Sequence, residues 1–85
     1  MSGMSWIAAD YPYKTIMIKG TTGNAKGLLE YVCEAEPSVA VGAETGWRIR
    51  KLIYDSDGFN TQVLWANGSR KFDKKQTSYA SYTYT

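Results

Sequence analysis

The dipeptide Asn67-Gly68 most constrains how this chain can fold, because it lies between two runs that alternate polar and apolar residues. A type I′ turn requires positive φ angles at both central residues, so Asn-Gly strongly favours a two-residue hairpin loop. That loop places Trp65 opposite Arg70 and puts Trp65 and Phe72 on one face. We therefore expect a β-hairpin here, with a cation–π contact between Trp65 and Arg70.

A second hairpin turn is predicted at residues 55–59, Asp-Ser-Asp-Gly-Phe. This segment suits a three-residue loop with its glycine in the left-handed conformation, which pairs Asp55 with Phe59 and Ile49 with Trp65. A four-residue loop would divide the aromatic residues between the two faces. The three-residue loop is therefore favoured.

The two turns together assign three consecutive strands to two faces. The inner face, expected to be buried, consists of Trp47, Ile49, Ile53, Phe59, Val63, Trp65 and Phe72. The outer face consists of Arg48, Arg50, Leu52, Tyr54, Asn60, Gln62, Leu64 and Lys71. Lys51 is a misfit on the inner face, and we expect it at a sheet margin with its ammonium in water.

The other strands are predicted from residue type and alternation. Residues 15–19 form a short β-branched run that ends at Gly20. Residues 28–36 fit both helical spacing and alternation, and their β-forming residues favour a strand. Residues 77–85 alternate Tyr with Ser, Thr and Ala, which is typical of a last strand.

Composition limits both the fold and the chemistry. A chain of 85 residues makes one small domain. We expect an all-β domain over residues 1–85, a small antiparallel meander of five or six strands forming a barrel or sandwich, with residues 1–14 as an N-terminal arm. No apolar run approaches the ~20 residues that cross a bilayer. With no His and a single Cys, the chain lacks an imidazole base, an intrachain disulfide and a cysteine zinc site.

Three segments could suggest chemistry, and each has a simpler interpretation. Residues 20–27 are Gly-rich but lack the Gly-Lys-Ser/Thr end of a phosphate loop. Asp55 and Asp57 suit a tight turn better than a cation site. Cys33 is favoured as a small hydrophobic residue, since no His could activate it. We therefore expect no enzyme activity, no catalytic, metal-binding or cofactor-binding residue, and no cofactor.

Two surfaces are candidates for binding. Arg48, Arg50, Lys71 and Tyr54 on the outer face could bind single-stranded nucleic acid through phosphate pairing and base stacking. The inner position of the Trp and Phe residues makes an ordinary solvated sheet face the better fit. A carbohydrate-binding domain would require an exposed Trp.

The terminal tyrosines form the other candidate surface. Tyr79, Tyr82 and Tyr84 suit a strand that pairs either with its own sheet or with a neighbouring subunit. Charge is also uneven, because residues 1–44 carry three lysines against five acidic residues and residues 45–85 carry seven basic against three acidic residues. This asymmetry permits head-to-tail self-association, although pairing within the chain is the simpler interpretation.

Several segments resemble a group of short proteins encoded by tailed bacteriophages. The group shows Tyr-x-Gly-x-Ala-x-Pro-Gly, Trp-x-Ile-x-x-Ile-x-Tyr-Asp-x-x-Gly, Trp-Ala-x-Gly, a Phe and a closing aromatic run. The matching residues in this chain are Tyr31, Ala35, Pro37, Trp47, Ile49, Leu52, Ile53, Tyr54, Asp55, Gly58, Trp65, Ala66, Gly68, Phe72, Tyr79, Ala80, Ser81 and Tyr82. Cys33 and Ser38 replace glycines of the pattern, and Gln76 stands in place of a Trp.

The resemblance covers residues 31–84 and implies a non-enzymatic protein of the virion, associated with its tail or capsid. It implies protein–protein contacts with other virion proteins or with copies of itself, as a homo-oligomer or symmetric array. It also implies a location in the virion after synthesis in the bacterial host cytoplasm. It transfers no catalytic residue and no membrane partner. Single-stranded nucleic-acid binding by a small β-barrel remains the alternative function.

Overall fold

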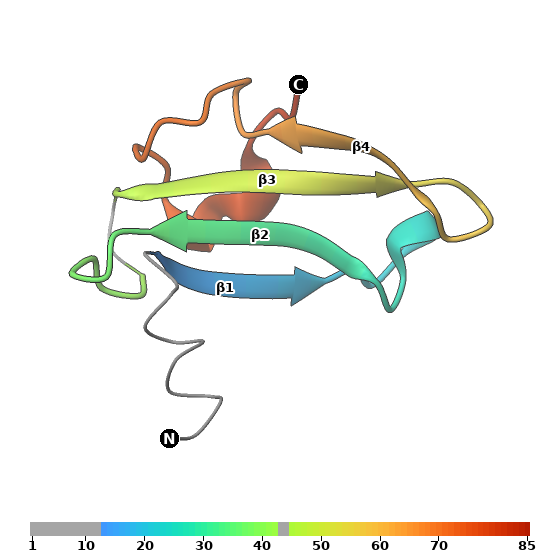
Figure 1. The fold of residues 1–85 in the computed structure, drawn as a ribbon, viewed down its shortest axis with the longest axis horizontal. Coiled ribbons are helices and arrows are strands. Elements are labelled where there is room, and N and C mark those ends of the chain that lie inside the picture. The colour runs from blue at the N-terminus through green and yellow to red at the C-terminus, as the bar shows by residue number, and fades with distance from the viewer. Residues whose placement is uncertain (1–12, 43–44) are drawn as a thin grey trace, which may run out of the picture.

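The computed structural model describes residues 13–42 and 45–85, which form one antiparallel sheet with two short 3₁₀ helices. The sheet has the strand order β1-β2-β3-β4, and Figure 1 shows it as a single twisted layer. The strands are β1 Lys14–Lys19, β2 Leu29–Ala35, β3 Trp47–Tyr54 and β4 Asn60–Trp65. The helices are η1 Gly23–Ala25 and η2 Gln76–Ser81. The antiparallel order and the strand over residues 28–36 are as predicted.

The described residues contain four strands in an open sheet, where five or six strands in a barrel or sandwich were expected. The predicted N-terminal arm, 1–14, overlaps β1 at Lys14 and otherwise lies largely outside the described residues. The last strand predicted over 77–85 is replaced by η2 and a short extended end. In a 3₁₀ helix, residues three apart lie on the same side, so Tyr79 and Tyr82 both reach the core from this segment.

The Asn67-Gly68 turn forms as predicted, but the strand after it does not. Both residues have positive φ angles, 53° and 67°, and the Ser69 amide donates to the Ala66 carbonyl over 3.1 Å. The partner of Trp65 is Thr85, with which it exchanges two backbone hydrogen bonds of 3.2 and 3.1 Å. The prediction that Arg70 to Phe72 pair with β4 is therefore wrong, because the end of the chain occupies that edge. The predicted contact between Arg70 and Trp65 is present, with the guanidinium 5.5 Å from the ring centroid.

The loop at residues 55–59 also forms as predicted, and a β-bulge beside it changes the faces of β4. The Asp55 amide donates to the Phe59 carbonyl over 2.9 Å. Tyr54 pairs with Asn60, but Ile53 then pairs with Gln62, so the register shifts by one residue. A one-residue shift moves every later side chain of the strand to the opposite face.

The bulge corrects the predicted face assignment. Arg50 pairs with Trp65 and Leu52 pairs with Val63, so Trp65 and Val63 share a face with the arginines. Gln62 and Leu64, expected outside, lie on the face of Trp47. Phe72 also lies with the arginines, since the Arg48 guanidinium is 4.6 Å from its ring centroid. The sequence pattern contains no sign of the extra residue, because Thr61 is compatible with either register.

The face that carries Trp47 holds the core, and we call it the covered face. Trp47, Ile49 and Cys33 are its largest fully buried side chains. Figure 1 shows η2 lying behind β2 and β3. The side chains that pack against the buried cluster are Ile16, Ile18, Tyr31, Val39, Tyr79, Tyr82 and Tyr84. Tyr79, Tyr82 and Tyr84 of the C-terminal segment therefore help to cover this face.

Candidate interaction surface

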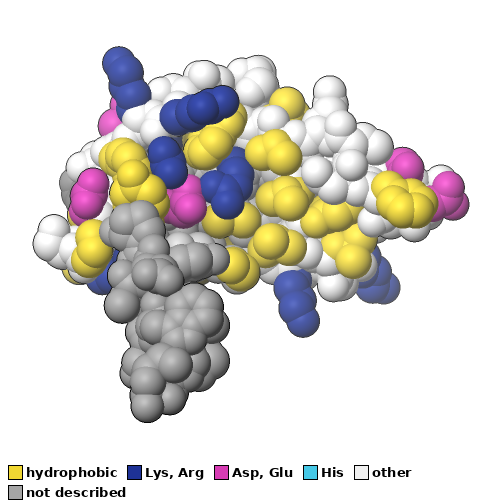
Figure 2. All heavy atoms as spheres, in the orientation of Figure 1, with side chains coloured by type: hydrophobic (Ala, Val, Ile, Leu, Met, Phe, Trp, Pro, Cys, Tyr) yellow, Lys and Arg dark blue, Asp and Glu magenta, His cyan; other side chains and the backbone are white. Residues whose placement is uncertain are grey.

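The opposite face of the sheet, which we call the open face, is shown in Figure 2. The strand register places on it Met17, Val32, Glu34, Arg48, Arg50, Leu52, Val63 and Trp65. Hydrophobic side chains extend across this face, with basic side chains gathered among them (Figure 2). No element of the described residues covers it in the way that η2 covers the other face.

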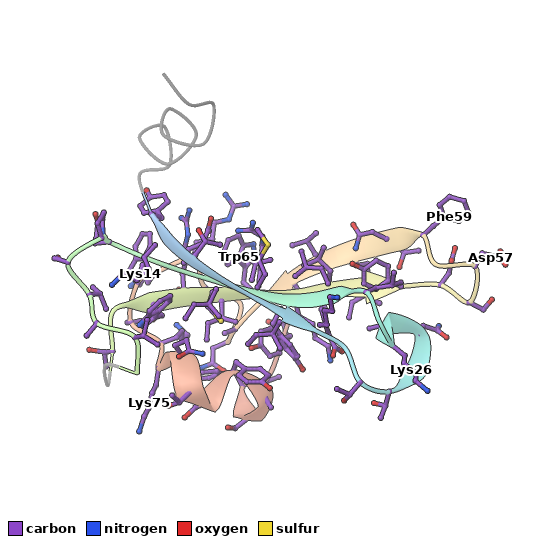
Figure 3. All side chains as sticks on the ribbon, turned by 90° about the horizontal axis from the view of Figure 1, so that it is seen from below. Lys14, Lys26, Asp57, Phe59, Trp65 and Lys75 are labelled. Carbon is purple, nitrogen blue, oxygen red and sulfur yellow. The ribbon has the colours of Figure 1, made fainter. Side chains whose placement is uncertain are left out.

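The open face carries large hydrophobic side chains that are exposed to solvent. Met17 is 60% exposed and Val63 is 46% exposed. Phe59, at the tip of the hairpin between β3 and β4, is 69% exposed and points to the side away from η2, the side on which Trp65 also lies (Figure 3). Val41, on the loop between β2 and β3, is the other exposed large hydrophobic residue in the described chain. This concentration on one face is typical of an interaction surface.

Arginines stack on aromatic rings at the end of the open face where β3 begins. The Arg48 guanidinium lies 4.9 Å from the Tyr13 ring centroid and 4.6 Å from that of Phe72. Arg50 and Arg70 lie 5.7 and 5.5 Å from the Trp65 ring centroid. We call this group the arginine–aromatic cluster; its members are Tyr13, Arg48, Arg50, Trp65, Arg70 and Phe72. Each stacked pair contributes about 0.5–1 kcal/mol at such partly exposed positions.

Glu34 holds two of these arginines in place. Its Oε1 accepts hydrogen bonds from Arg48 Nε at 3.0 Å and from Arg50 Nη1 at 2.7 Å. The three side chains are 15–30% exposed, so solvent screens the pairs less than at a free surface. Glu34 pairs with two guanidinium groups, and Arg70 adds a third positive charge over the Trp65 ring, so this end of the open face keeps a positive charge.

The far end of the open face is acidic. The hairpin tip carries Asp55 and Asp57 beside the exposed Phe59 (Figure 3). Asp55 Oδ1 accepts hydrogen bonds from the Asp57 and Phe59 amides at 2.9 and 3.0 Å, which fixes the loop as the turn that the sequence predicts. Asp57 is exposed. The open face thus has a basic aromatic end, an apolar centre and an acidic tip.

The structure brings together only part of the predicted basic surface. Arg48 and Arg50 are adjacent on the open face, whereas Lys71 is exposed in the loop after the Asn67-Gly68 turn. Tyr54 uses its hydroxyl to donate to the Leu29 carbonyl over 2.5 Å. Sequence reasoning missed Trp65 as a member of this surface, since only the bulge places it there.

The predicted interface tyrosines pack against the chain's own core. Tyr79, Tyr82 and Tyr84 are half-buried. The Tyr84 hydroxyl donates to the Tyr79 carbonyl over 2.5 Å, and the Lys75 amide donates to the Tyr82 hydroxyl over 2.7 Å. Burial raises the pKa of Tyr84 well above its ordinary value, with smaller contributions from nearby groups. An interface role for these residues stays a prediction.

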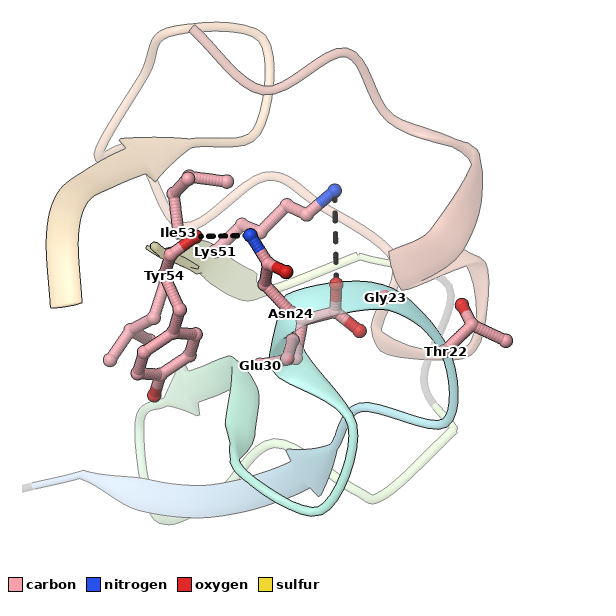
Figure 4. A pocket seen from close by; sticks show the side chains of 9 residues that line it. Thr22, Gly23, Asn24, Glu30, Lys51, Ile53 and Tyr54 are labelled. Atoms are coloured by element: carbon pink, nitrogen blue, oxygen red, sulfur yellow. Dashed lines mark hydrogen bonds and ion pairs between the residues drawn. The ribbon is translucent and has the colours of Figure 1, made fainter. Parts of the chain in front are cut away.

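A hollow of about 190 Å³ lies between η1 and the end of β3 (Figure 4). It contains an ion pair between Lys51 Nζ and Glu30 Oε2 at 3.9 Å, so its two opposite charges balance. The Gly-rich loop beside it closes on itself, because the Gly27 amide donates to the Gly20 carbonyl over 3.0 Å. A Cβ on Gly20 would lie 2.4 Å from the Ala25 oxygen, so this glycine permits the close approach. The loop is a packing element, as its sequence suggests.

Cys33 is fully buried, and burial raises the pKa of its thiol to about 11. A thiol that stays protonated in a closed core is a poor nucleophile. No group of three His, Cys, Asp or Glu residues suited to a metal ion occurs within 13–42 and 45–85. In the same residues, no helix is long and apolar enough to cross a membrane. No protein-family model, no curated protein and no solved structure matches the chain.

Proposed function

We propose that this chain is a non-enzymatic structural protein of a bacteriophage particle, which acts through protein–protein contacts made by its open face. The observation that carries the proposal is an apolar sheet face that residues 13–42 and 45–85 leave uncovered, with Met17 and Val63 exposed. Burying one such side chain in an interface contributes about 1.5–3 kcal/mol. Trp and Arg, which flank these residues, are common hot-spot residues of protein interfaces.

The bacteriophage assignment is supported by the resemblance of residues 31–84 to short proteins of tailed phages. Tail or capsid association, partners among other virion proteins or copies of the chain, and repetition by symmetry belong to the same proposal. The test is to purify intact particles and identify their proteins by mass spectrometry. We expect the chain in fixed proportion to the major virion proteins, and its absence from the particles would overturn the assignment.

A second experiment on particles tests the role of the open face. Particles assembled with Met17→Lys should incorporate less of the chain, because a charge would replace an exposed apolar contact. Val41→Lys is the matched control, since it makes the same charge change at another exposed apolar residue, on the loop between β2 and β3. Equal incorporation of both variants would remove the open face from the proposal.

One observation favours single-stranded nucleic-acid binding as a second candidate: Trp65 lies on the same face as Arg48 and Arg50. Aromatic rings among basic residues can stack bases at about 1–3 kcal/mol each. However, Arg50 and Arg70 already stack on the Trp65 ring, and Glu34 offsets part of the charge. Oligonucleotide affinity measured across salt concentrations tests this function, since phosphate contacts require a steep salt dependence. A flat or absent response would exclude it.

The proposal also includes the closed sandwich that the sequence predicts. Two sheets of a sandwich pack about 10 Å apart with their apolar faces together. Residues 13–42 and 45–85 supply one sheet with one open apolar face. A sandwich would therefore be completed by a partner.

A further inference from the structure

We infer that the partner of the open face is a second copy of this chain, in a two-fold dimer that seats the hairpin tip of each copy on the arginine–aromatic cluster of the other. The inference rests on the proposed function, because it takes the open face as a protein-binding surface and names the occupant. Three features of the open face support a second copy as the partner: its charge distribution, its exposed anchor residues and its area.

Opposite charges occupy the two ends of the open face, which makes the face complementary to itself. Arg48 and Arg50 lie in the first half of β3 with Glu34 as their counter-charge, and Arg70 lies over the neighbouring Trp65 ring. Asp57 lies at the other end, on the hairpin tip. Electrostatic complementarity of this kind selects partner and orientation more than it adds affinity.

The charges also select one symmetry axis. Face-to-face copies can be related by a two-fold axis in the plane between the sheets, either along the strands or across them. An axis along the strands keeps the strand direction and would bring the acidic tips of the two copies to the same end of the dimer. An axis across the strands, level with the Leu52–Val63 pair, reverses strand direction and keeps β4 over β4. The acidic tip and the basic cluster lie at opposite ends of the paired strands β3 and β4. Reversing the strand direction therefore places each tip on the cluster of the other copy.

Phe59 supplies the anchor that such an arrangement needs. Its side chain is 69% exposed and extends from the tip toward the open-face side (Figure 3). The cluster offers arginine planes and the Trp65 ring, which are suitable partners for an aromatic side chain. Met17 and Val63, both exposed, lie between the ends and would be buried against the facing sheet.

The area of the face is enough for a weak, specific dimer. Four strands about 4.8 Å apart and up to eight residues long cover roughly 500 Å². Two such faces bury roughly 1,000 Å² in total, which is near the lower limit for specific interfaces. We therefore expect a dimer with a dissociation constant in the micromolar range.

The experiment is sedimentation equilibrium of the full chain over a wide concentration range, repeated with single variants. Phe59→Ser should raise the dimer dissociation constant about tenfold or more, as expected for an aromatic anchor that becomes buried on binding. Its matched control is Val41→Ser. This change removes a hydrophobic side chain that is 64% exposed, close to the value for Phe59, from the loop between β2 and β3. The control should leave the constant within about twofold. Equal effects of both changes would contradict the inference.

A charge exchange tests the orientation. Asp57→Arg and Arg70→Asp should each weaken the homodimer, because each places like charges at both contacts. Mixing the two variants should restore association, because both contacts of the mixed dimer then join opposite charges. One contact keeps the natural Asp57–Arg70 pair, and the other has the two charges exchanged. Both side chains are exposed, so neither change should affect folding. Lys75→Glu, a reversal on the side toward η2 (Figure 3), should have no effect.

Three outcomes overturn the inference: a monomer at all concentrations, a dimer insensitive to Phe59→Ser, or a dimer that Asp57→Arg strengthens. These outcomes differ from failure of the proposed function. A strict monomer that still enters phage particles through the open face would reject the second copy and keep the function. A dimer that is absent from particles would support the two-fold arrangement of the open faces and reject the phage assignment.

Discussion

The two faces of the sheet differ in how far their apolar side chains are buried, and the tryptophan on each face shows the difference. Trp47 on the covered face is fully buried under residues from the C-terminal segment. Trp65 on the open face is only partly buried, and the guanidinium groups of Arg50 and Arg70 lie over its ring. Within the described residues, the C-terminal segment covers one face, whereas the other face keeps Met17 and Val63 exposed beside its arginines. The difference shows that coverage, rather than residue type, separates the buried core from the exposed face here.

The largest expected difference between the faces is in stability. Trp47→Ala should lower the free energy of unfolding by about 3–5 kcal/mol, because it leaves a large cavity in the core. Trp65→Ala should cost about 1–2 kcal/mol, through partial burial and lost arginine stacking. Urea denaturation at low protein concentration measures both. Equal losses would contradict the division into covered and open faces.

The covered face should also be sensitive to alkaline pH through Cys33. Burial raises the pKa of this thiol from 9.0 to about 11, so between these values only the unfolded chain loses the proton. The free energy of unfolding should therefore be intact below pH 9 and fall by about 2–3 kcal/mol as the pH rises to about 11. Urea denaturation at several pH values measures this loss. Cys33→Ala should remove that part of the pH dependence; an unchanged slope would show that the tyrosines cause it.

On the open face, Glu34→Gln should lower the free energy of unfolding by about 1–2 kcal/mol. Its carboxylate accepts from both Arg48 and Arg50, and these partly buried groups would lose their counter-charge. Glu36→Gln, an exposed neighbour, should change stability by less than about 0.5 kcal/mol. Thermal denaturation at low and high salt compares the two variants. A Glu34 effect no larger than the control would show that the arginines are held by their aromatic contacts alone.

The smallest effects come from two tyrosine hydroxyls. Tyr84→Phe removes the hydrogen bond to the Tyr79 carbonyl and should cost about 1 kcal/mol, while Tyr54→Phe removes the bond to Leu29 and should cost about 0.5 kcal/mol. The second carbonyl is more readily reached by water because it lies near the sheet end. Denaturation midpoints measure both, and a larger loss for Tyr54→Phe would reverse this ranking.

Local turn chemistry was predictable from the sequence, whereas long-range pairing was not. Asn67-Gly68 and the 55–59 loop form with the expected geometry, because the positive φ angles they need depend on residue type. The bulge opposite Ile53 and the pairing of Trp65 with Thr85 depend on tertiary packing. As a result, Arg48 and Arg50 were placed correctly together, but Trp65 was assigned to the wrong face.

Acrylamide quenching of tryptophan fluorescence tests the central claim most directly. The measurement uses variants that keep only Trp47 or only Trp65, with the other tryptophans replaced by Phe, at protein concentrations below any dimerisation. The account predicts a protected, blue-shifted emission from Trp47 and a readily quenched emission from Trp65. Equal protection of both residues would contradict the account, because the open face would then be covered by the chain itself.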